Sequence, residues 1–93
     1  MSPTEPVDPA AARRHLTDVR RLVLAIIADE PSITADQIVT RWAERRPGLS
    51  ARHTAALPRM TSQTLWRLEN LGWVIRAHGR FSITEQGQVA RYL

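Results

Sequence analysis

The hydrophobic pattern of this chain changes its period at Gly72, and this change constrains the fold more than any other feature. Before Gly72, apolar residues and threonines recur at about 100° per residue and fall on one side of a helix: Leu57, Thr61, Thr64, Leu65, Leu68 and Leu71. After Gly72, large apolar residues take strand spacing on either side of the turn sequence Ala77-His78-Gly79-Arg80: Trp73, Ile75, Phe81 and Ile83. The sequence therefore predicts a helix that ends at Gly72, followed by a two-stranded β-hairpin.

Two further helices are predicted before residue 54. Asp8-Pro9 is a favourable helix start, and the apolar spacing that follows predicts one helix over residues 9–28. Thr34 and Gln37 form a capping-box pattern that opens a second helix, which ends at Pro47-Gly48. The expected buried stripe of this second helix is Ala35, Ile38, Val39, Trp42 and Ala43.

Pro58 limits where the third helix can begin. Proline is tolerated in the first turn of a helix and disfavoured later, so we expect the start between Thr54 and Arg59. A short last helix begins at Thr84-Glu85 and carries Val89, Tyr92 and Leu93. Residues 1–8 are rich in proline and are expected to form a disordered or extended arm. The remaining residues, 9–93, form one domain that is mainly α with a small β-hairpin, an α+β class.

Composition narrows the class of partner. The 93 residues carry a net charge of +4, and all thirteen basic side chains are arginine. This excess of arginine over acidic side chains suggests a polyanionic partner, although a GC-rich genome also enriches arginine. The chain has no cysteine, which excludes disulfides, thiolate catalysis and cysteine zinc sites. No apolar run reaches the roughly 18 residues that span a bilayer, and the N-terminus lacks the pattern of a signal peptide. We therefore expect a cytoplasmic protein with no membrane association.

Two stretches resemble winged helix-turn-helix proteins. Residues 68–76, LENLGWVIR, look like the end of a recognition helix that runs into the first wing strand, and residues 81–87, FSITEQG, are similar to the close of the wing in small bacterial and phage regulators of the MarR and PadR kinds. The resemblance covers about residues 10–93. It implies a three-helix core, a two-stranded wing, a short C-terminal helix and a role in transcription regulation as a repressor. The segment from Arg46 to Pro58 is longer than the tight turn usual in that family.

The third helix carries the candidate DNA-binding residues. If its leucines face the core, the opposite face presents Arg59, Ser62, Gln63, Trp66, Arg67 and Asn70, none of which is acidic. Arginine suits guanine edges and phosphates, asparagine and glutamine suit adenine, and serine suits phosphate. Trp66 is equally consistent with DNA contact and with packing against protein. An ordinary polar helix face that happens to lack acids is the competing interpretation.

The hairpin tip supplies a second group of candidates, which are Arg76, His78 and Arg80. A basic wing of this kind enters the minor groove or lies along the backbone, although a basic tip is also compatible with a solvated turn. These residues, together with the third helix, predict sequence-specific binding of double-stranded DNA. The alternatives are a winged-helix adaptor that binds protein through Trp66, and an architectural protein that binds DNA with little sequence preference.

The sequence contains no pattern for catalysis, a metal site or a cofactor, so we expect no enzyme activity. A homodimer on a two-fold-related DNA site is expected, because Leu24 falls outside the apolar arc of the first helix and because Tyr92-Leu93 makes the C-terminus apolar. Any small-molecule effector is unspecified by the sequence.

Overall fold

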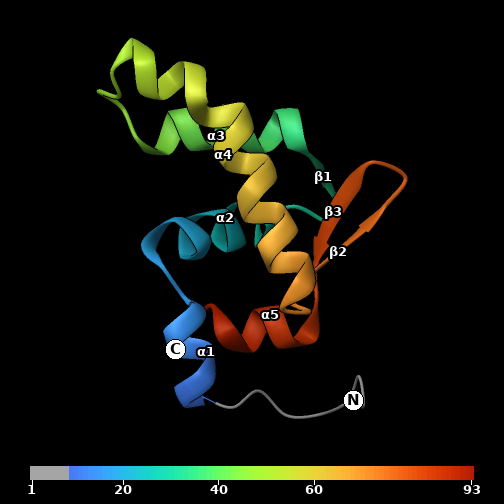
Figure 1. Ribbon diagram of the computed structural model, residues 1–93. Coiled ribbons are helices and arrows are strands. Elements are labelled where there is room, and N and C mark those ends of the chain that lie inside the picture. Colours follow the sequence, from blue (N-terminus) through green and yellow to red (C-terminus); the bar gives the residue numbers. More distant parts are fainter. Residues whose placement is uncertain (1–8) are drawn as a thin grey trace.

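The computed structural model describes residues 9–93, so the arm expected over residues 1–8 lies outside the described residues. The described chain is mainly helical with one small antiparallel sheet, in agreement with the expected α+β class. Figure 1 shows α4 crossing the molecule between α2 and the hairpin. The elements are α1 (Pro9–His15), α2 (Asp18–Ala28), β1 (Ile33–Thr34), α3 (Ala35–Arg45), α4 (Ala51–Asn70), β2 (Val74–Ala77), β3 (Arg80–Ile83) and α5 (Glu85–Ala90).

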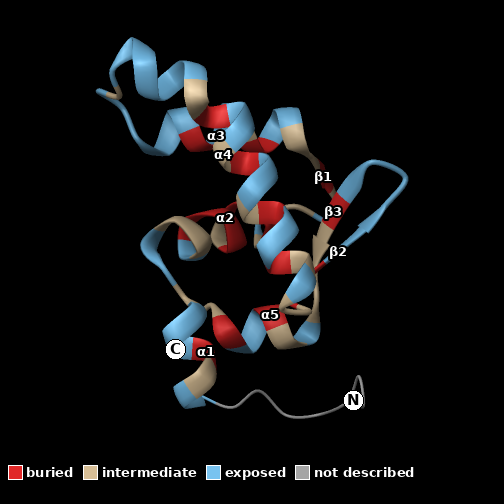
Figure 2. Ribbon diagram, viewed as in Figure 1, coloured by how far each residue is buried: buried red, intermediate tan, exposed pale blue. Residues whose placement is uncertain are grey.

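The single helix expected over residues 9–28 is wrong, because the chain breaks between α1 and α2. Thr17 is the N-cap of α2, and its hydroxyl accepts a hydrogen bond from the backbone N–H of Arg20 at 3.2 Å. Asp18 adds an acidic side chain to the first turn, where the helix dipole favours it. The break allows α1 to pack against α5 and to bury Ala12 (Figure 2).

Leu24 also differs from expectation. It was placed outside the apolar arc of its helix, but its exposed fraction is 0%. α2 contacts α3, α4 and β3. Because these elements cover several sides of the helix, a residue outside its apolar arc is also buried. The burial of Leu24 removes one of the two reasons for expecting a dimer.

The capping box that opens α3 is confirmed. The backbone N–H of Thr34 donates to Gln37 Oε1 at 3.0 Å, and the N–H of Gln37 donates to Thr34 Oγ1 at 3.2 Å. Ile38 and Trp42 are buried as expected, but Ala43 is exposed because α3 contacts the body along a narrower stripe. The extended link before α3 forms β1, a strand the sequence did not predict, in which Ile33 pairs with Phe81 of β3.

α4 begins at Ala51, earlier than the start expected between Thr54 and Arg59. Ser50 is its N-cap and accepts a hydrogen bond from the N–H of His53 at 3.2 Å. Pro58 therefore lies inside the helix, where it removes one backbone hydrogen bond, and the ribbon of α4 changes direction after its first turns (Figure 1). The connection between α3 and α4 is consequently residues 46–50, shorter than the segment from Arg46 to Pro58 that the sequence suggested.

The core side of α4 agrees with the predicted stripe. Leu57, Thr61, Leu65 and Leu68 are buried, whereas Thr64 and Leu71 are partly buried. Trp42 and Trp73 belong to the same core cluster, as expected. This orientation turns the opposite face of α4 to solvent (Figure 2).

The hairpin of β2 and β3 is confirmed, with the sheet order β1-β3-β2. His78 and Gly79 form the turn with φ values of 54° and 73°, which is the combination that a two-residue type I′ turn requires. Val74 is paired with Ile83, and opposite residues share one face of the sheet. Ile75 faces the other way and is 58% exposed.

The start of α5 is also as predicted. Thr84 is its N-cap and accepts from the N–H of Gly87 at 3.0 Å, while its hydroxyl donates to the carbonyl of Gly72 at 2.7 Å. The helix ends at Ala90, so Tyr92 and Leu93 lie beyond it and not on it as expected. Val89 and Tyr92 are exposed. No helix within residues 9–93 has the length and apolar character needed to cross a membrane.

Candidate nucleic-acid interface

The candidate side chains from α4 and the hairpin are all exposed. The set is Arg59, Ser62, Gln63, Trp66, Arg67, Asn70, Arg76, His78 and Arg80. For the six candidates on α4, this exposure follows from the burial of the leucines on its other side, because the helix face opposite a buried stripe is turned to solvent. The six candidates on α4 therefore form one continuous surface, here called the α4 stripe.

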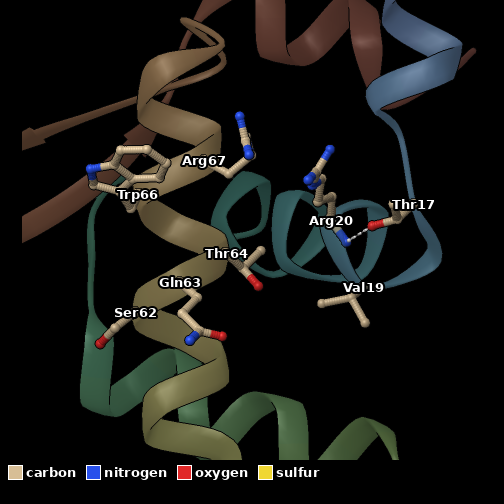
Figure 3. Close-up of a pocket in the computed structure, with 8 residues that line it drawn as sticks. All are labelled: Thr17, Val19, Arg20, Ser62, Gln63, Thr64, Trp66 and Arg67. Carbon is tan, nitrogen blue, oxygen red and sulfur yellow. Dashed lines mark hydrogen bonds between the residues drawn. The ribbon is translucent and has the colours of Figure 1, made fainter.

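A groove of about 630 Å³ lies between the α4 stripe and the N-terminus of α2. Figure 3 shows Thr64 and Arg67 on the side of α4 that faces α2, with Trp66 and Ser62 on its other side. Across the groove lie residues that sequence reasoning did not include, namely Thr17, Val19 and Arg20. The local signal for them was the Thr17-Asp18 pair, an N-cap followed by an acid, which the prediction of one continuous helix passed over.

Positive charge is concentrated along this groove. The guanidinium of Arg67 lies 5.5 Å from the ring centroid of Trp66, a cation–π arrangement that orients both side chains. The guanidinium of Arg20 donates to the carbonyl oxygen of His15 at 2.6 Å, which holds this group near the start of α2. Neither Arg20 nor Arg67 forms an ion pair with another described residue. Both charges are therefore free to meet an anion.

Asn70 is placed differently from the rest of the stripe. Its side-chain amide donates to the carbonyl oxygen of Trp66 at 2.6 Å, one turn back along the helix. This hydrogen bond uses one of the two N–H groups that an adenine contact would employ. Asn70 thus has less capacity for base recognition than Gln63, for which no side-chain hydrogen bond is formed within the described residues.

Arg76 is tied to α4 by an ion pair. Its Nε lies 3.4 Å from Oε1 of Glu69, which is the acidic residue at the flank of the stripe. The Glu69 side chain is more buried than that of Arg76, at 26% against 60% exposed. The pair neutralises part of the charge at the base of the hairpin, so Arg80 is the hairpin arginine that has no ion pair within residues 9–93.

Three acidic residues form ion pairs with the arginines of α3. Glu30 and Glu44 pair with Arg41 at 3.0 and 3.8 Å, and Asp29 pairs with Arg45. From Ala51 to Leu68, α4 contains no acidic residue. The arginines of α3 are thus paired with acidic side chains, whereas the arginines of α4 form no ion pair within the described residues.

The described residues contain no group of three or more histidines, cysteines, aspartates or glutamates that could hold a metal ion. Comparisons with protein-family models, with curated proteins and with solved structures found no match to this chain.

Proposed function

We propose that this protein binds double-stranded DNA in a sequence-specific manner and regulates transcription as a repressor. The observation that carries the proposal is the α4 stripe, which is exposed, rich in arginine and amide side chains, and without an acid from Ala51 to Leu68. A surface that meets a polyphosphate cannot keep carboxylates without repulsion, while a merely solvated helix usually mixes both signs.

The order of elements supports a winged helix-turn-helix assignment. α3, the connection of residues 46–50 and α4 are the parts of a helix-turn-helix, in which the second helix lies in the major groove. The hairpin follows α4 directly and occupies the position of a wing. In this arrangement, Gln63 and Arg67 face base edges, Ser62 contacts phosphate, and Arg80 lies on the minor groove or the backbone.

Selection of bound sequences from a random duplex pool tests the proposal, followed by affinity measurements over a salt series. Binding should weaken by about 0.9 log units per phosphate contact for each decade of salt. Gln63→Ala or Arg67→Ala should cost about 1–3 kcal/mol and relax base preference, whereas Arg80→Ala should weaken all sequences alike. Arg14→Ala on α1 is the control for loss of one charge. Failure to enrich any sequence, with no binding to random duplex at low salt, would refute the proposal.

A second candidate function is a protein-binding adaptor, and the observation that favours it is Trp66, which is 61% exposed in the middle of the stripe. A gel-shift experiment with random duplex at low salt separates the two candidates, because an adaptor does not bind the duplex and leaves its mobility unchanged. The same gel series identifies the architectural alternative, for which the selected and random duplexes bind with similar affinity.

A homodimer is part of the proposal, and it depends on exposed side chains at the end of α5 and just beyond it. Tyr92 is 76% exposed and Val89 is also exposed, so two apolar side chains lie uncovered near the C-terminus. Sedimentation should give a dimer on DNA, and Val89→Ser with Tyr92→Ser should reduce it to a monomer. A monomer at high concentration, both free and on DNA, would remove the dimer from the proposal.

A further inference from the structure

The first turns of α4 extend away from the body of the protein together with the connection that precedes them. We call residues 46–56 the overhang. Within it only Leu49 and Ala56 are partly buried, and every other residue is exposed. Figure 2 shows this region in pale blue, at the opposite end of the molecule from α1. Of the overhang residues, Leu49 packs against the hydrophobic core.

The charge of the overhang is positive and uncompensated. It carries Arg46 and Arg52, and no acidic residue occurs in the chain between Glu44 and Glu69. The guanidinium groups of Arg46 and Arg52 make no ion pair or hydrogen bond within the described residues, in contrast to the paired Arg41 and Arg45. Arg46 and Arg52 are thus both exposed to solvent and carry charge that no acidic partner within the described residues offsets.

The beginning of α4 is ordered by local hydrogen bonds. Ser50 Oγ accepts from the N–H of His53 at 3.2 Å and lies 2.9 Å from His53 Nδ1. A short helical extension is marginal in water, and this cap supports its first turn together with Leu49, which packs against the core. The cap holds Arg52 on a helix rather than on a loop, which gives its side chain a defined direction.

Arg52 lies on α4 at helical spacing from the α4 stripe, before the change of direction at Pro58. It precedes Arg59 by seven residues and Gln63 by eleven, and at 3.6 residues per turn these spacings return to nearly the same face. Eleven residues at about 1.5 Å each place Arg52 roughly 16 Å from Gln63 along the helix. The major groove is about 12 Å wide. If Gln63 reaches base edges, Arg52 lies beyond the groove, beside the phosphates of its edge.

We propose that the overhang is a second phosphate-binding element, in which Arg46 and Arg52 contact the DNA backbone outside the groove that the rest of α4 occupies. This inference rests on the proposed function, and it extends the contact surface to residues that sequence reasoning left out. The side chains act as point contacts for phosphate oxygens, so they raise affinity for every sequence and carry no base preference.

The test compares two double variants of the full chain that remove the same charge. Arg46→Gln with Arg52→Gln neutralises the overhang while keeping helix propensity, and Arg13→Gln with Arg14→Gln neutralises α1, where both arginines are exposed. Affinity for the duplex selected by the wild-type protein, and for a random duplex, is measured over a salt series. Circular dichroism and thermal unfolding verify that each variant folds.

The overhang variant should lower the slope of log affinity against log salt by about 1.8, which is two phosphates at 0.9 each, with the same base preference as wild type. The α1 variant should change the slope by less than half as much. Equal slopes in the two variants would overturn the inference, and so would an altered base preference or a loss of dimer in the overhang variant. Absence of salt-dependent binding by the wild-type protein would instead refute the proposed function itself.

Discussion

Gly87→Ala should destabilise this protein although alanine favours helices. Gly87 lies inside α5, and a Cβ at this position would come within 2.2 Å of the backbone oxygen of Trp73 and 2.7 Å of Ile83 Cγ1. Real Cβ contacts rarely fall below 3.0 Å, so α5 must move by at least 0.8 Å, the difference between 3.0 and 2.2 Å. A backbone oxygen cannot rotate out of the way. The same oxygen accepts a hydrogen bond from the N–H of Thr84 at 3.0 Å, so the movement also disturbs the cap of α5.

The magnitude follows from three opposing contributions. Overpacking costs about 1–3 kcal/mol, and weakening the hydrogen bond to Trp73 costs about 1 kcal/mol. Alanine returns roughly 1 kcal/mol through helix propensity and a less flexible unfolded chain. We expect a net loss of about 2 kcal/mol in the free energy of unfolding, which corresponds to a Tm lower by about 8–16 °C for a domain of this size.

The assay is urea and thermal unfolding followed by circular dichroism. Gln88→Ala is the matched control, because Gln88 is exposed on the same helix and should change stability by less than about 0.5 kcal/mol. A Gly87→Ala protein as stable as wild type would show that α5 does not approach Trp73 this closely, and the placement of the hairpin against α5 would then need revision.

Three further results are expected. Thr61 is 1% exposed and its hydroxyl has no hydrogen-bond partner within the described residues, so Thr61→Val should stabilise the fold by about 1 kcal/mol in urea unfolding. Thr64→Val is the control and should not stabilise the fold, because the Thr64 hydroxyl donates to a backbone carbonyl at 2.8 Å. A destabilised Thr61→Val protein would contradict this prediction. Thr34→Ala removes the hydroxyl that accepts from the N–H of Gln37 and should lower stability by about 1 kcal/mol, with an unchanged unfolding midpoint as the contrary result. Glu69→Gln releases Arg76 from its ion pair. Under the proposed function, it should raise DNA affinity up to about fivefold and steepen the slope of log affinity against log salt by about 0.9. Both effects must vanish when Arg76 is also replaced by alanine.

Local patterns in the sequence predicted the features that depend on only a few neighbouring residues. The capping box of Thr34 and Gln37 and the turn at His78-Gly79 are completed within four residues, so they form wherever the surrounding chain permits. The leucine spacing of α4 likewise determined which side of that helix faces the core. The exposure of the α4 stripe followed from the same spacing.

Other features were decided only by packing between distant segments. The break at Thr17 allows α1 to reach α5, and the enclosure of α2 by three other elements buries Leu24. The groove brings Arg20 beside Arg67, and the hairpin brings Arg76 to Glu69. No local propensity encodes these pairs, because their geometry depends on how the helices cross. α4 begins at Ala51 despite Pro58, because Ser50 caps the first turn and Leu49 packs against the core, while the proline removes one backbone hydrogen bond.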